Sequence, residues 1–215
     1  RNLSHEYYTG FGEVHLTPGT TWRAVPWLDA GARVEGPAVA VLERSFLQAW
    51  NDAGGTPFDI NLPPTGNAGI ECRSGGANSD HQAVFTFPSP VTVSGASVTP
   101  EPGKSASVAG PPVISPDGRT VTVNLTDVTD VQTITITLLG VNNGTSTNDV
   151  PVLMRLLVGD TNANGAVNAS DVSQTKSQLG QAVTSLNFRT DVTVNGTINA
   201  SDLALVKSRS GTGAP

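Results

Sequence analysis

The chain has 215 residues, of which 37% are hydrophobic and only 14% charged, and its net charge at pH 7 is −6. This length suits one or two domains with a packed core. An acidic chain with no basic stripe is not expected to bind nucleic acid, and no apolar run reaches the roughly 20 residues that a membrane span needs. The single cysteine, Cys72, excludes an internal disulfide.

Glycine and proline divide the first 55 residues into short pieces. Short strands are predicted at 13–16 and 21–25, whereas the run 38–50 alternates like a strand in its first half and shows helical spacing in its second half. We interpret residues 1–55 as an extension of short strands that packs on the following domain or on a neighbouring subunit. All three tryptophans lie in this segment: Trp22, Trp27 and Trp50.

Residues 56–158 contain short runs, rich in Val, Ile and Thr, in which apolar and polar residues alternate. The clearest runs are 120–125 (TVTVNL) and 133–138 (TITITL). Such runs form half-buried antiparallel strands, and the Pro- and Gly-rich stretches between them are typical of turns. About seven short strands at this spacing predict an immunoglobulin-like β-sandwich.

Two twelve-residue segments near the C-terminal end repeat each other: 160–171 (DTNANGAVNASD) and 191–202 (DVTVNGTINASD). Both have the spacing of an EF-hand-type calcium loop, with oxygen-bearing side chains at positions 1, 3, 5 and 9, glycine at 6, a backbone carbonyl at 7 and a carboxylate at 12. Calcium is a hard cation that takes 6–8 oxygen ligands. The predicted ligands are Asp160, Asn162, Asn164, Ala166, Asn168 and Asp171 in the first loop, and Asp191, Thr193, Asn195, Thr197, Asn199 and Asp202 in the second.

The charges of this region fall on the predicted ligand positions. From Leu156 to Pro215 the only acidic residues are the four aspartates at loop positions 1 and 12. Two carboxylates per loop neutralise one Ca²⁺ and favour a moderate affinity, on the order of 10⁻⁶ to 10⁻³ M. Extracellular calcium satisfies such a site, whereas resting cytosolic calcium does not. Thr193 replaces the usual Asn or Asp at position 3, so the second site is expected to be the weaker one.

The repeat pair resembles type I dockerins from about Gly159 to Ser210. The matching features are Asp at position 12, the glycine before the first loop, the Asn-Ala-Ser-Asp loop endings and a lysine five residues beyond each of them. The resemblance implies a small all-α domain over 159–215 that binds two Ca²⁺ and docks to a cohesin. The partner-binding residues that it implies are Ala169, Ser170, Lys176, Ala200, Ser201 and Lys207.

The preceding domain carries a resemblance of its own. Residues 58–63 (FDINLP) and 69–76 (GIECRSGG), followed by a Phe-Thr-Phe and a Val-Thr-Val-Asn-Leu strand, resemble a domain common in large secreted bacterial proteins, usually just before dockerin-like repeats. The resemblance implies an extracellular location and no known activity. The chain begins at Arg1, as expected of a processed protein or a piece of a longer one.

The predicted sandwich enters the first calcium loop without a Pro/Thr or Gly/Ser linker, whereas dockerins of cellulose-degrading enzymes trail on flexible linkers. We therefore interpret the chain as a secreted, non-catalytic calcium-binding structural or interaction protein of a bacterial surface. Two Ca²⁺ would stiffen a filament or layer, in which sheet edges pair copies of the chain.

Two alternatives remain open. The protein is a dockerin that docks to a cohesin, in either of two orientations because the repeats match. Otherwise it is a carbohydrate-binding module of a larger secreted enzyme, with the tryptophans stacking on glycan rings. The sequence has no G-x-S-x-G, Walker or dinucleotide motif, and no catalytic residue is predicted.

Overall fold

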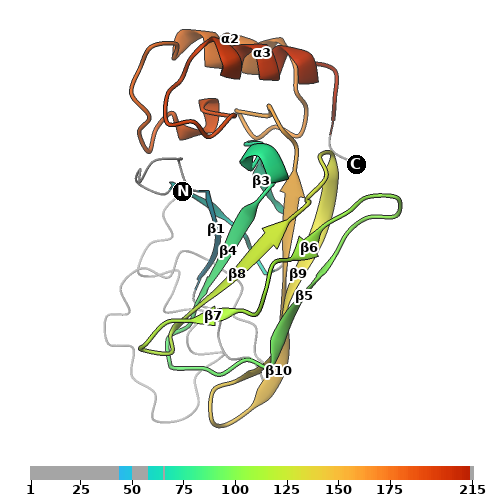
Figure 1. Ribbon diagram of the computed structural model, residues 1–215, viewed down its shortest axis with the longest axis vertical. Coiled ribbons are helices and arrows are strands. Elements are labelled where there is room, and N and C mark those ends of the chain that lie inside the picture. Colours follow the sequence, from blue (N-terminus) through green and yellow to red (C-terminus); the bar gives the residue numbers. More distant parts are fainter. Residues whose placement is uncertain (1–43, 50–57, 65, 214–215) are drawn as a thin grey trace, which may run out of the picture. The chain divides into compact units, whose positions relative to one another are not determined.

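The computed structural model describes residues 44–49, 58–64 and 66–213. All of them belong to one compact unit, Gly36–Pro215. The chain is mostly β, with two helices near its C-terminal end (Figure 1). The predicted order, a mainly β part followed by a small helical part, is confirmed.

The first sheet has the strand order β2-β1-β4-β8-β6, and β7 also pairs with β8. Its pairings are antiparallel. The strands are β1 (Arg44–Ala49), β2 (Phe58–Asn61), β4 (His81–Thr86), β6 (Ser107–Val108), β7 (Val113–Ile114) and β8 (Thr120–Thr126).

The second sheet has the order β3-β10-β9-β5. Here β3 runs parallel to β10, whereas the other pairings are antiparallel. The strands are β3 (Gly69–Glu71), β5 (Gly95–Thr99), β9 (Gln132–Asn142) and β10 (Thr147–Leu156).

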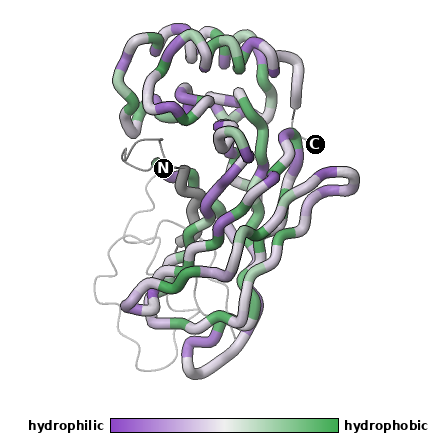
Figure 2. Tube along the Cα trace, in the orientation of Figure 1, coloured by the Kyte–Doolittle hydropathy of each residue, from purple (hydrophilic) through white to green (hydrophobic). Residues whose placement is uncertain are grey.

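One hydrophobic core lies between the two sheets. The predicted run 120–125 lies in β8 and buries Val121, Val123 and Leu125, while the run 133–138 lies in β9 and buries every second residue. Both sets belong to the same cluster. Figure 2 shows that hydrophobic and hydrophilic residues are mixed along the strands. The alternation in sequence thus gives each strand one face for the core.

Strand β1 lies within residues 1–55, which the sequence analysis set apart from the sandwich. It pairs with both β2 and β4, so it occupies an inner position of the first sheet. Its sequence, RSFLQA, lacks strict alternation, which explains why periodicity alone left this run ambiguous. The strands predicted at 13–16 and 21–25 and the three tryptophans lie outside the described residues.

Beyond β10 the chain forms the helices α2 (Ala169–Ser177) and α3 (Ala200–Arg209), with the short 3₁₀ helix η2 (Phe188–Thr190) between them; a further 3₁₀ helix, η1 (Gly76–Asn78), lies in the β-region. Asn168 and Asn199 cap α2 and α3 in the same way, each within a capping box. No helix in the described part of the chain has the length and apolar character of a membrane span.

A second hydrophobic cluster joins the strands to the helices. Its fully buried members are Leu157, Val167, Val192 and Val206. Leu157 directly follows β10, and Ile70 of β3 and Val131, just before β9, pack against the cluster as well. The helical segment therefore shares its core with the two-sheet domain.

Candidate calcium centre

The first loop turns its backbone around the carboxylate of Asp160. This carboxylate accepts hydrogen bonds from the backbone N–H groups of Asn164, at 3.0 Å, and Gly165, at 2.8 Å. Gly165 has a φ of +86°, which only glycine adopts cheaply. The tight turn of the loop thus places a buried carboxylate at position 1.

Asp171 closes the same loop from the first turn of α2. Its two oxygens accept the backbone N–H groups of Asn162, at 3.2 Å, and Asn168, at 2.9 Å. Asp171 is also fully buried. Positions 1 and 12 are therefore fixed by backbone hydrogen bonds and brought close together.

The second loop repeats this arrangement. Asp191 accepts the N–H groups of Asn195 and Gly196, at 3.1 and 3.0 Å. Asp202 accepts those of Thr193 and Asn199, at 3.0 and 2.8 Å. All four aspartates predicted from the sequence thus lie in equivalent positions.

The electrostatics of both loops favour a cation. Burial raises the pKa of Asp160 and of Asp191; the backbone N–H bonds oppose this rise, and the repulsion from the paired aspartate of the same loop adds to it. A divalent cation would remove the repulsion within each pair. The surrounding donors are amide and carbonyl oxygens, which suit a hard cation. In the described ranges, no group of three or more His, Cys, Asp or Glu that could hold a metal occurs; each loop brings together two aspartates.

Residues 158–209 match the family model of the dockerin type I domain. The match begins just after β10 and does not extend over the two-sheet domain. Searches against curated proteins and against solved structures found no match. Dockerin domains are calcium-binding protein-interaction modules, and both loops lie within the matched residues.

The two loops of the dockerin segment differ at position 3. The Thr193 hydroxyl donates to Oδ1 of Asp202 at 2.7 Å. In the first loop, the side-chain oxygen of Asn162 instead accepts the N–H of Asn164 at 3.0 Å. In the first loop, the Thr161 hydroxyl donates to Oδ1 of Asp171 at 3.3 Å, so both closing carboxylates accept a hydroxyl and the bond in the second loop is the shorter one. The weaker second site stays a prediction.

The asparagines at position 9 have a role that the ligand prediction missed. The side-chain oxygens of Asn168 and Asn199 each accept a backbone N–H at 2.8 Å, from Ser170 and Ser201 respectively, and so cap α2 and α3. The sequence signal was present, because Asn-x-x-Asp before a helix is a form of the capping box. A ligand role through a water stays a prediction for both residues.

Position 4 of each loop has a left-handed backbone. Ala163 has a φ of 59° and Val194 a φ of 57°. This conformation costs an L-residue roughly 1–2 kcal/mol. Both residues occupy position 4 of their loop, so the left-handed conformation is a property of the loop geometry and not of one residue.

Arg189, which the sequence analysis did not single out, ties the first loop to the two-sheet domain. Its guanidinium donates to three backbone carbonyls: that of Thr161 at 2.9 Å, and those of Asp160 and Ile70 at 3.0 Å each. Its own carbonyl accepts the Cys72 thiol at 3.3 Å. Burial raises the pKa of Cys72 to about 12, so this thiol is an inert packing group.

A buried ion pair lies beside Arg189. Arg73 binds Glu71 through two side-chain hydrogen bonds of 2.9 and 2.7 Å, and both side chains are almost fully buried. Burial alone would raise the pKa of Glu71, but attraction to Arg73, the hydrogen bonds from Arg73 and attraction to His81 together hold this pKa below its ordinary value. The Arg73 guanidinium lies 5.0 Å from the ring centre of Phe188 in the dockerin segment, and Phe188 stacks on Phe58.

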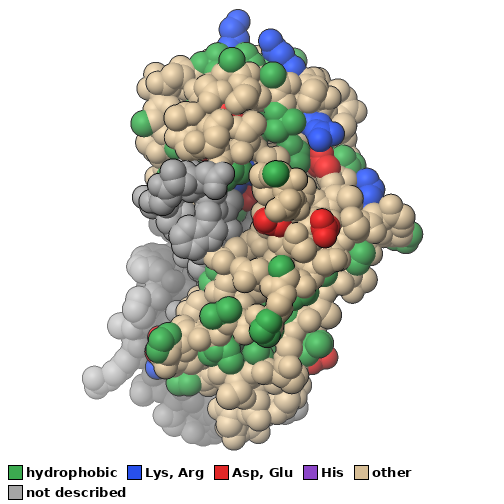
Figure 3. Space-filling model, viewed as in Figure 1, with side chains coloured by type: hydrophobic (Ala, Val, Ile, Leu, Met, Phe, Trp, Pro, Cys, Tyr) green, Lys and Arg blue, Asp and Glu red, His purple; other side chains and the backbone are tan. Residues whose placement is uncertain are grey.

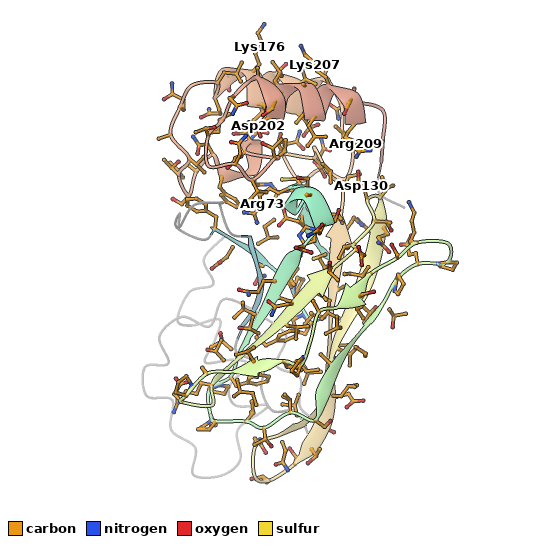
Figure 4. All side chains as sticks on the ribbon, viewed as in Figure 1. Arg73, Asp130, Lys176, Asp202, Lys207 and Arg209 are labelled. Atoms are coloured by element: carbon orange, nitrogen blue, oxygen red, sulfur yellow. The ribbon has the colours of Figure 1, made fainter. Side chains whose placement is uncertain are left out.

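A surface ion pair adds a third link. Arg209, at the end of α3, lies 3.5 Å from Asp130 (Figure 4). Asp130 also accepts the backbone N–H of Val158, at 2.8 Å, directly before the first loop. The absence of a linker in the sequence therefore corresponds to direct packing of the dockerin segment on the two-sheet domain.

Proposed function

We propose that this protein docks to a cohesin-type partner outside the cell through its dockerin segment, with one Ca²⁺ in each of the two loops. The observation that carries the proposal is the matched exposure of two helix faces. Ala169 and Ser170 at the start of α2 and Lys176 in its last turn are exposed, and so are Ala200, Ser201 and Lys207 on α3.

The two faces have the same construction. Each begins at an Asn cap, continues with Ala-Ser-Asp and presents its lysine in the last turn of the helix. Lys176 and Lys207 project outward from α2 and α3 on the same side (Figure 4). Basic side chains also stand out from the helical segment in Figure 3. Two equivalent faces support binding of one partner in two orientations.

We further propose that the two-sheet domain is an immunoglobulin-like β-sandwich and non-catalytic. Two mainly antiparallel sheets over one core support this assignment, although the parallel pairing of β3 with β10 sets it apart from a purely antiparallel sandwich. Proteins with dockerin domains are typically extracellular or on the cell surface, which supports secretion of this chain by a bacterium.

Calorimetry and cohesin binding test this function. We expect two Ca²⁺ per chain and calcium-dependent capture by at least one of a panel of type I cohesins. Charge reversal of one lysine, K176E or K207E, should leave binding through the other face, whereas the double variant should lose it. R119E, on an exposed turn of the two-sheet domain, is the control. No capture of the calcium-loaded protein by any cohesin would refute docking.

A filament or layer stiffened by Ca²⁺ remains a second proposal. It is favoured by the direct packing of the dockerin segment, which gives the chain a fixed joint instead of a tether. Electron microscopy with and without chelator tests it, and monodisperse monomers at every calcium level would refute it. Glycan binding by the tryptophan-containing residues 1–55 stays a prediction, which a glycan array would test.

A further inference from the structure

The hydrophobic core of the dockerin segment includes residues of the two-sheet domain. Only four residues of the second hydrophobic cluster are fully buried, and one of them, Leu157, comes from the end of β10. Burying an aliphatic side chain of this kind stabilises a fold by about 1.5–3 kcal/mol. The dockerin segment also buries Val194 and Ile198, and its cluster is completed by the apolar surface that Ile70, Val131 and Leu157 provide.

Backbone hydrogen bonds cross the junction between the two-sheet domain and the dockerin segment. The backbone N–H of Ser74 donates to the carbonyl of Val192 in the second loop at 2.8 Å. The N–H of Gly159, directly before the first loop, donates to the carbonyl of Cys72 at 2.9 Å. Both calcium loops are therefore bonded to the short stretch that follows β3.

Arg189 lies two residues before the second loop. Its side chain donates hydrogen bonds to two carbonyls at the start of the first loop and to one carbonyl of β3. A planar guanidinium can hold three carbonyls in fixed directions, whereas a lysine ammonium cannot reproduce this fork. Any rearrangement at the start of the first loop is thus passed to β3 through one side chain.

We propose that Arg189 is a positioning residue that couples calcium binding in the first loop to the order of the junction with the two-sheet domain. This inference rests on the proposed calcium function. Ions that bind only the ordered loops stabilise whatever is ordered together with them. Calcium therefore stabilises the stretch after β3 as well as the loops. Conversely, the two-sheet domain holds Asp160 in place for the ion.

The positive charge of Arg189 weakens Ca²⁺ binding in the first loop, whereas its hydrogen bonds strengthen it. A cation near Asp160 disfavours Ca²⁺, and attraction to Arg189 already offsets part of the rise in the pKa of Asp160. Replacement by alanine would mix a gain from lost repulsion with a loss of positioning. R189K keeps the charge and removes the fork, so it isolates the positioning effect.

The experiment compares the wild-type chain, R189K and the control R119K by calcium titration calorimetry and by hydrogen exchange at backbone amides. R119K makes the same exchange at an exposed turn that contacts neither loop. We expect roughly tenfold weaker binding at one of the two sites of R189K, in line with the loss of charged hydrogen bonds. The Ser74 and Gly159 amides should gain protection with calcium in the wild type, and much less in R189K.

Each outcome has a defined meaning. Equal calcium affinity and equal gains in protection for R189K and the wild type would overturn the role of Arg189. If R189K does not fold, the wild type alone decides the coupling, since unchanged exchange of the Ser74 and Gly159 amides on adding calcium would contradict it. A wild-type chain that binds no calcium would instead overturn the proposed function.

Discussion

Replacing Arg73 by methionine should destabilise the protein by about 3–5 kcal/mol at pH 7, because it leaves the buried Glu71 without its partner. Methionine fills the space of the side-chain stem, so the main loss is electrostatic. Glu71 avoids carrying an unpaired buried charge by taking up a proton. For a carboxyl with the ordinary pKa of 4.5, this costs about 3 kcal/mol at pH 7, because each pKa unit is worth about 1.4 kcal/mol. The bonds to the Phe58 carbonyl and the contact with Phe188 add the remainder.

The pH dependence distinguishes this mechanism from loss of packing. In the variant the pKa of Glu71 is raised, so the protonated form is favourable below the ordinary pKa and becomes costly as the pH rises. The electrostatic part of the loss should therefore fall below about 1 kcal/mol at pH 5. Urea unfolding in saturating calcium, followed by circular dichroism at both pH values, measures it, with R119M as the exposed control. The double variant E71Q/R73M should recover most of the loss at pH 7. A cost under about 1 kcal/mol at pH 7, or an equal cost at pH 5, would refute the reasoning.

Three further predictions concern the loops and His81. T193N should strengthen calcium binding at the second site and N162T should weaken it at the first, each on the order of fivefold in affinity. The reason is that one hydrogen bond competing for a ligand oxygen is worth about 1 kcal/mol. Calorimetry that finds no change at either site would contradict this. A163G should stabilise the calcium-free protein by up to about 1 kcal/mol, because Ala163 is exposed and has a left-handed backbone. The control A204G, on the exposed face of α3, should destabilise the protein by about as much. Thermal unfolding in the presence of a chelator compares the two variants. Burial lowers the pKa of His81 below its ordinary 6.5, so stability present above that pH is lost as the pH falls; H81Q should flatten the decline between pH 7 and 5, and an unchanged slope would rule out His81 as its cause.

The calcium loops could be predicted from the sequence because all their oxygen donors lie within twelve consecutive residues. Spacing alone therefore places Asp160 and Asp171 in one site, and the backbone bonds of the structure agree with it. Strands β8 and β9 could be predicted for a similar reason, since each buries alternate residues on one face. In both cases the information is local.

The junction could not be predicted because its contacts are remote in sequence. Arg189 and Ile70 are 119 residues apart, and Cys72 reaches the carbonyl of Arg189 over 117 residues. The parallel pairing of β3 with β10 has no periodic signature either. The missing linker was the only local sign that the two parts meet, and it gave no indication of which residues join them.

The direct passage from β10 into the first loop also determines how several copies would share one scaffold. A module on a flexible spacer finds a second binding site at an effective concentration that the spacer length sets. Here the strand ends at Leu156 and the loop begins at Asp160, so no spacer exists to adjust the reach. Avidity in such an array would therefore depend on the spacing of the binding sites. Neighbouring copies would bind together only where this spacing matches the directly joined domains, and would otherwise bind one at a time.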